Sequence, residues 1–156
     1  MELSSGAIPA GSSIDLRHAE SGIGGGNISP DLAWTPGPEG TRSYAVSCHD
    51  PDAPTGSGWW HWLITDIPAD VTSIPLGGPT PPGSREWPND YGYRGWGGSW
   101  PPPGDPAHHY VFTVTATNTP RLDVSDDATH AYVRLMLHFA TLERASFTGL
   151  FANEAG

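Results

Sequence analysis

Four polar side chains of the sequence, Asp50, His61, His108 and Tyr110, have the chemistry of a ligand-binding or acid–base site. Imidazole and phenol groups donate hydrogen bonds, so together they suit phosphate or carboxylate oxygens. A carboxylate repels an anion, and we therefore interpret Asp50 as the acceptor that fixes the tautomer of a neighbouring imidazole and supports its protonated form.

The position of Asp50 follows from the strand that precedes it. Residues 42–49 (RSYAVSCH) alternate, so that Tyr44, Val46 and Cys48 share the core-facing side of a predicted strand. One further step of two residues reaches Asp50. The carboxylate is therefore predicted at the end of the strand, on its buried side.

A second predicted strand places His108 in the same way. Residues 108–118 (HHYVFTVTATN) alternate between two faces. The core-facing set is Tyr110, Phe112, Val114 and Ala116. One step of two residues from Tyr110 towards the N-terminus reaches His108, which is therefore predicted on the same buried side. His61 lies near the start of a third predicted strand, residues 60–68. Polar groups on the buried side of strand ends indicate a pocket that opens between sheets.

Three sharper chemistries have weaker support. Ser99 lacks the Gly-x-Ser-x-Gly elbow of a hydrolase nucleophile. The seven histidines do not occur at a recognised metal-ligand spacing. The glycine-rich residues 22–27 are followed by Ile-Ser-Pro instead of a helix, so they indicate a turn and not a phosphate loop. We expect no metal ion and no cofactor.

Composition limits the classes of partner. The 156 residues predict one domain, residues 1–156, and carry a formal net charge of -10 with no lysine. Such a chain is a poor candidate for binding nucleic acid or an anionic membrane surface. The acidity is equally compatible with an adaptation of solubility to salt. Cys48 is the single cysteine, which excludes an intrachain disulfide and a cysteine-based zinc site.

Targeting signals are not apparent in the sequence. The first residues show no basic segment followed by an apolar run, and no apolar stretch is long enough to cross a bilayer. We therefore expect a cytoplasmic protein without a transmembrane segment.

The remaining sequence predicts an all-β fold with one helix near the C-terminus. Twenty glycines and seventeen prolines separate short strands. Residues 127–144 predict the helix, introduced by Ser125, Asp126 and Asp127. The apolar stripe expected to dock on the sheet is Tyr132, Leu135, Met136, Phe139 and Leu142. A final strand is expected in residues 146–152, and residues 77–104 predict a long loop.

Three motifs together resemble a known family. DPDAP (residues 50–54), WWHW (residues 59–62) and PPPGDPAHHY (residues 101–110) resemble the signature of the phosphatidylethanolamine-binding protein family, also called Raf kinase inhibitor-like proteins. NISPDLAW, IPADVTSIPLG and NDYGYRGWGG are similar to segments of its bacterial and archaeal branch. The resemblance extends over nearly the whole chain.

The resemblance implies a Greek-key antiparallel β-sandwich with a C-terminal helix and a small anion-binding pocket at one end. The ligand-binding residues that it implies are Asp50, Pro54, Trp59, His61, Pro101, Pro102, His108 and Tyr110. Family members bind phosphate-bearing head groups, acetate or similar small anions there.

Three residues and one segment depart from the family pattern. His109 stands where arginine is usual, Trp100 where a small residue is usual, and Trp96 where tyrosine is usual. The segment between Leu76 and Trp87 is also short. A bulkier and less cationic mouth favours an aromatic or hydrophobic acid over a lipid head group.

Two function classes follow from the same residues. The first is a binding protein for a small anionic or phosphate-bearing ligand. The second is a pathway enzyme, a cyclase, isomerase or other acid–base catalyst, in which His108 or His61 acts as acid–base and Asp50 orients it. A homodimer is compatible with either class.

Overall fold

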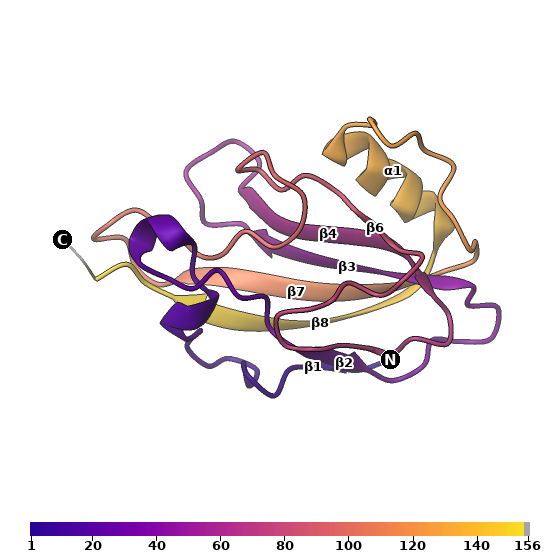
Figure 1. The fold of residues 1–156 in the computed structure, drawn as a ribbon, viewed down its shortest axis with the longest axis horizontal. Coiled ribbons are helices and arrows are strands. Elements are labelled where there is room, and N and C mark those ends of the chain that lie inside the picture. Colours follow the sequence, from indigo (N-terminus) through magenta and orange to yellow (C-terminus); the bar gives the residue numbers. More distant parts are fainter. Residues whose placement is uncertain (155–156) are drawn as a thin grey trace.

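The computed structural model describes residues 1–154 and arranges them as two antiparallel sheets and one α-helix, with two short 3₁₀ helices near the N-terminus (Figure 1). The strands are β1 Leu3–Ser4, β2 Leu32–Trp34, β3 Ser43–Asp50, β4 Trp59–Pro68, β5 Ser73–Ile74, β6 Arg85–Glu86, β7 His108–Thr117 and β8 Thr141–Phe151. The helices are η1 Leu16–His18, η2 Ser21–Ile23 and α1 His130–Ala140. The mainly β architecture with one C-terminal helix is confirmed; Greek-key connectivity stays a prediction.

The larger sheet contains the three strands predicted in residues 42–49, 60–68 and 108–118. Its order is β6-β4-β3-β7-β8, with β3 at the centre between β4 and β7. The smaller sheet has the order β1-β2-β5 and was not predicted, because strands of two or three residues are too short to show alternation.

The main core takes buried side chains from both sheets. Trp96, Phe112 and Phe147 stack in sequence, with ring centroids 5.9 Å and 5.0 Å apart. The smaller sheet contributes the buried residues Leu3, Leu32, Trp34 and Ile74. Two apolar faces packed on each other bury far more apolar surface than either sheet alone, which stabilises the short strands.

The predicted core-facing sides of β3 and β7 are correct at the pocket end. Asp50 and His108 are each 3% exposed, and Tyr110 is fully buried. His109, between them in the alternation, is exposed. The ends of β3 and β7 therefore bring a carboxylate and an imidazole to the buried side of one sheet.

The predicted bounds of the helix are wrong at both ends. Thr129 is the N-cap, and its hydroxyl accepts a hydrogen bond from Tyr132 N (3.2 Å), so Asp126 and Asp127 precede the helix. At the other end, Thr141 is already extended, and the following residues pair with β7. The last strand is therefore β8 Thr141–Phe151, longer than the predicted residues 146–152.

The predicted buried face of the helix is also wrong. Tyr132, Leu135 and Phe139 are 48%, 50% and 70% exposed, and Leu142 lies on β8. The buried helix residues are Val133 and Ala140, which belong to a second core cluster with Leu63, Trp87 and Leu122. Small side chains let the short helix approach the sheet closely, whereas the predicted stripe contains bulky ones. Figure 1 shows α1 on the side of the large sheet away from β1 and β2.

The long loop of residues 77–104 is mostly irregular, as predicted, and contains β6. It is held by buried aromatic residues: Trp87 is 1% exposed and donates from Nε1 to Thr65 Oγ1 (2.9 Å). Trp96 donates from Nε1 to the His18 carbonyl oxygen (3.0 Å). Across residues 1–154, the helices are all too short or too polar to span a bilayer.

Candidate functional site

All eight residues proposed from the sequence line one cavity of about 240 Å³. The cavity lies where β3 ends and β4 and β7 begin (left in Figure 1), so the loops after β3 and before β7 meet there. The expected neighbourhood of DPDAP and PPPG is found, because Pro54, Pro101 and Pro102 share its wall. Trp100, which the sequence placed at the mouth, also lines the cavity, and three further lining residues were not predicted: Ala53, Thr55 and Tyr91.

His108 lies between two carboxylates. Its Nδ1 is 2.7 Å from Asp50 Oδ2, and its Nε2 is 2.9 Å from Asp105 Oδ2. Burial lowers the pKa of His108, but the hydrogen bonds and charges of Asp50 and Asp105 outweigh burial, so that the pKa is raised overall. The imidazolium form is favoured, with both ring N–H groups donating to carboxylates.

Asp50 is itself held in place. Its Oδ1 accepts a hydrogen bond from the backbone N–H of Asp52 (2.8 Å), which leaves Oδ2 facing His108. A carboxylate with both oxygens engaged is a positioned acceptor, in agreement with the role that the sequence assigned to it. Asp105 was missed, because a loop residue has no periodic signal that would place its side chain beside His108.

His61 has the opposite electrostatic environment. Its Nδ1 lies 2.6 Å from the Gly97 carbonyl oxygen, which can only accept, so Nδ1 carries the proton. Burial lowers the pKa of His61 to about 4, although the Gly97 carbonyl and Asp50 oppose the shift. At neutral pH the ring is therefore neutral, and its buried Nε2 presents a lone pair with no hydrogen-bond partner in residues 1–154.

Two donors of the cavity are likewise buried without a hydrogen bond of normal geometry to any described residue: Tyr110 Oη and Trp59 Nε1. Burial raises the pKa of Tyr110 well above its ordinary value, the Asp50 carboxylate adds to the rise, and the Ser99 hydroxyl opposes it. Tyr110 is therefore a neutral phenol at any physiological pH. Buried polar atoms normally have partners, so this cluster is prepared for a ligand or for water.

The wall of the cavity is mainly aromatic. Trp59 and Tyr91 meet edge to face with centroids 5.1 Å apart, and His61 contacts Tyr110 in the same way at 5.1 Å. Tyr91 Oη donates to the Gly98 carbonyl oxygen (2.7 Å), which fixes its ring. Trp100 is 49% exposed and stands at the rim.

The departures from the family pattern lie in different environments. His109 is exposed, and its Nδ1 and backbone N are each 2.7 Å from Asp52 Oδ2, so it pairs with Asp52 outside the cavity. Trp96 packs in the main core and does not line the cavity. Only Trp100 changes the cavity itself, by adding an aromatic surface at its mouth.

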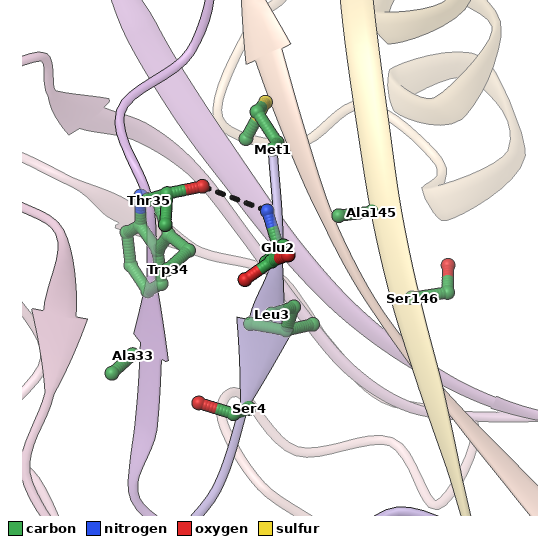
Figure 2. A pocket seen from close by; sticks show the side chains of 9 residues that line it. All are labelled: Met1, Glu2, Leu3, Ser4, Ala33, Trp34, Thr35, Ala145 and Ser146. Carbon is green, nitrogen blue, oxygen red and sulfur yellow. Dashed lines mark hydrogen bonds between the residues drawn. The ribbon is translucent and has the colours of Figure 1, made fainter.

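A larger hollow of about 610 Å³ lies at the seam between the sheets and offers less chemistry. Figure 2 shows residues of β1 between the side chains of Trp34 and Thr35 on one side and Ala145 and Ser146 on the other. The N-terminal ammonium pairs with Glu143 (2.8 Å), and Glu2 N donates to Thr35 Oγ1 (2.8 Å). The hollow lacks the concentration of titratable groups found around His108.

The cavity at the end of β3 can position an oxyanion but is not strongly cationic. One imidazolium stands among Asp50 and Asp105, and His61 is neutral at pH 7. Both nitrogens of His108 face carboxylates, and its direct contact with a ligand stays a prediction. Within residues 1–154, the cavity donors that have no hydrogen bond of normal geometry are Tyr110 Oη and Trp59 Nε1, and the corresponding acceptor is His61 Nε2.

Known proteins resemble this chain in sequence and in fold over nearly its whole length. The chain is 43% identical to the UPF0098 protein YbhB of Escherichia coli over 159 residues, covering 97% of this chain and 100% of that protein. It is also 43% identical to the crystal structure of E. coli YbcL, described as a member of the mammalian PEBP family, with a TM-score of 0.91 and 97% of each chain covered. The homologue CT736 of Chlamydia trachomatis shares the fold at 23% identity, with a TM-score of 0.83 and 96% and 95% coverage.

The profile of the phosphatidylethanolamine-binding protein family matches residues 4–152. This match includes the cavity and every strand from β2 onward. The sequence, the fold and the relatives agree, and the chain belongs to the phosphatidylethanolamine-binding protein family.

Proposed function

We propose that the chain is a binding protein for a small organic ligand with a phosphate or carboxylate head group. The observation that carries the proposal is a set of three buried polar atoms around one cavity: His61 Nε2, Tyr110 Oη and Trp59 Nε1. None of them has a hydrogen bond of normal geometry to a residue among 1–154. A head group that hydrogen-bonds to all three removes the cost of leaving them unsatisfied. The proposed ligand-binding residues are Asp50, Pro54, Trp59, His61, Pro101, Pro102, His108 and Tyr110.

The acceptor at His61 determines the protonation of the bound state. Tyr110 and Trp59 donate to anionic oxygens, but the lone pair of His61 Nε2 repels them. Binding therefore requires one proton, carried by the ligand as in a phosphate monoanion, or taken up by His61 when the anion raises its low pKa. Affinity should increase as the pH falls below about 6, where the phosphate group also takes up a proton.

The walls determine the organic part of the ligand. Prolines and aromatic rings surround the head group, and a volume of about 240 Å³ is smaller than the roughly 300–1,000 Å³ of sites for drug-sized ligands. Trp100 at the rim provides a surface for a planar group. The cavity thus favours a small aromatic or apolar acid over a bulky phospholipid.

Calorimetric titration with phenyl phosphate, inorganic phosphate and acetate tests the proposal. Phenyl phosphate should bind most tightly, because it offers both the head group and the ring. Tyr110→Phe should weaken binding about tenfold, the effect of one hydrogen bond to a charged group. Tyr132→Phe, on the exposed face of α1, is the matched control and should bind as the wild type does. No binding of any anion would contradict the proposal.

A second candidate function rests on His61 alone. A neutral imidazole with a fixed tautomer and a free Nε2 in an aromatic cavity is suited to take a proton from a substrate. His108, with both nitrogens on carboxylates, is a positioning group in this reading, together with Asp50. An enolisable aromatic acid is the test substrate. If the wild type turns it over and His61→Asn still binds it without turnover, a cyclase or isomerase is favoured.

The finer expectations about assembly and location also stay proposals. We propose one domain over residues 1–156, a cytoplasmic location and a homodimer. Cell fractionation tests the location. Light scattering coupled to size-exclusion chromatography tests the dimer. The mass of one chain is 16.6 kDa, so a dimer has twice the mass of a monomer and is readily told apart from it.

A further inference from the structure

The outer face of the large sheet carries a row of side chains that continues across four strands. Leu63 on β4 pairs with Ser47 on β3, Ser47 pairs with Thr113 on β7, and Thr113 pairs with Ser146 on β8. Three hydroxyl groups therefore lie side by side on adjacent strands, about 5 Å apart. Thr113 Oγ1 and Ser146 Oγ are 2.8 Å apart and share a hydrogen bond.

This row is the floor of a groove bordered by α1. The groove has a volume of about 370 Å³. Its lining residues are Ser47, Trp60, Leu63, Thr113, Arg134, Leu137, His138, Arg144 and Ser146. Two arginines and a histidine thus surround three hydroxyls, and this lining includes no carboxylate.

Such a lining contrasts with the composition of the chain. Seventeen carboxylates accompany only seven arginines. Within residues 1–154, neither Arg134 nor Arg144 has a carboxylate within salt-bridge distance. Arg85, by comparison, pairs with Asp66 at 2.5 Å. Two guanidinium groups that have no ion-pair partner within residues 1–154 thus line one groove of an acidic protein.

Arg134 is fixed in position. Its Nε donates to His130 Nδ1 (2.8 Å), and its guanidinium lies 4.2 Å from the centroid of the Trp60 ring. Neither terminal nitrogen of Arg134 has a hydrogen-bond acceptor within residues 1–154, so both can donate to a ligand. Burial lowers the pKa of Arg134, with Asp90 opposing the shift, which shows that water solvates this cation incompletely. Asp90 is itself engaged by Trp60 N (2.7 Å).

We propose that this groove is a second binding site, for a small molecule that carries a phosphate monoester. Guanidinium groups donate to phosphate oxygens in a forked arrangement, and hydroxyls add neutral donors. Leu137 on α1 provides apolar surface for the organic part of the ligand, whereas Leu63 is fully buried.

The groove is separate from the cavity at the end of β3. Ser47 and Thr113 alternate with the core-facing residues Cys48 and Phe112, so they lie on the opposite face of the sheet. The two sites share none of their lining residues. A ligand bound to one can therefore be distinguished from a ligand bound to the other.

Nuclear magnetic resonance titration of the ¹⁵N-labelled chain with phenyl phosphate and with inorganic phosphate, at constant ionic strength, tests the proposal. The amides of Ser47, Thr113 and Ser146 should shift and saturate. Arg144→Gln should weaken this binding about tenfold, because it removes a charge-assisted hydrogen bond to the ligand. The exposed Arg144 side chain makes no hydrogen bond or ion pair within residues 1–154, so the fold should be unaffected. Arg42→Gln, which removes the same charge from an exposed position outside the groove, is the matched control.

The outcomes separate the two sites. Tyr110→Phe should weaken about tenfold the titration of the amides around the cavity at the end of β3 and leave the groove titration unchanged. Shifts at Ser47 and Thr113 that do not saturate, or that respond equally to Arg144→Gln and Arg42→Gln, would overturn the proposal by showing general screening of charge. Saturation with inorganic phosphate as strong as with phenyl phosphate would refute the role of Leu137 and identify free phosphate as the ligand.

Discussion

His108 Nδ1 lies 2.7 Å from Asp50 Oδ2, although 58 positions separate the two residues in the sequence. Each occupies the end of a strand, Asp50 as the last residue of β3 and His108 as the first of β7. Antiparallel pairing of β3 with β7 brings these ends together on the buried side of the sheet. The pair is therefore a direct product of strand register, and it sets the charge of the cavity.

The charge of His108 should depend on Asp50. Asp50→Asn is expected to lower the pKa of His108, because it removes one of the two carboxylates that favour the imidazolium form. Titration of the His108 ring resonances measures the shift. Asp70→Asn, at an exposed turn, is the control and should leave the pKa unchanged. An unaltered His108 titration in Asp50→Asn would show that the pair does not form in solution.

Asp105 occupies the nitrogen of His108 that a ligand anion would otherwise contact. Its side chain is 40% exposed, so it can leave more easily than Asp50. Asp105→Asn is expected to tighten the binding of phenyl phosphate severalfold, since it removes a negative charge near the cavity and weakens the competing contact. Calorimetric titration measures the change. Weaker binding in this variant would instead make Asp105 a supporting residue of the site.

The low pKa of His61 makes the fold sensitive to acid. A histidine whose folded pKa lies below its unfolded value contributes stability above the unfolded pKa, and this stability is lost as the pH falls from about 6.5 towards 4. For His61, the loss at pH 4 relative to pH 7 is about 3 kcal/mol. His61→Asn keeps a donor for the Gly97 carbonyl oxygen but cannot take up the proton.

Urea unfolding at pH 7 and pH 4 measures this effect. The wild type should lose more stability on acidification than His61→Asn does. His108 acts in the opposite direction, because its raised pKa stabilises the fold at low pH and this contribution is lost as the pH rises through the folded pKa. Equal losses in wild type and His61→Asn would contradict the neutral, buried state of His61.

The buried face of α1 predicts unequal effects of two similar truncations. Val133→Ala should destabilise the fold by about 2 kcal/mol, because it leaves a cavity beside Leu63 and Trp87. Leu135→Ala removes more atoms but from a side chain that is 50% exposed, so the free energy of unfolding should change by less than about 1 kcal/mol. Denaturant unfolding measures the free energy of unfolding of both variants. A larger loss in Leu135→Ala than in Val133→Ala would contradict the buried face seen in the structure and support the face expected from the sequence.

The sequence predicted the cavity better than the helix for a physical reason. Strand alternation has a period of two, so a single well-defined strand determines the side on which Asp50 or His108 lies. The apolar residues of α1 offer two competing stripes, and the sequence favours the bulkier one, with Leu135 and Phe139, as the buried face. The contacts of Val133 and Ala140 with Trp87 and Leu122 decide the face, and these partners come from distant loops.

The residues missed around the cavity lie in loops. Tyr91 and Asp105 follow no period, and their places depend on how the irregular residues before β7 pack as a whole. The sequence of this loop does not tell which of its aromatic rings face the cavity. The short strands of the small sheet were hidden for a similar reason, because β1 and β5 each have only two residues.

The most direct test of the account is the number of protons taken up when phenyl phosphate binds. Calorimetric titration at pH 7 in buffers of different ionisation enthalpy measures it. For the wild type, we predict a net proton uptake that leaves one proton shared between the bound ligand and His61. In His61→Asn, only the ligand can take up a proton, so the net uptake on binding should be smaller. Tyr110→Phe should weaken binding without changing the proton count. Binding without proton uptake, or with the same uptake in His61→Asn, would contradict a site built around the free Nε2 of His61.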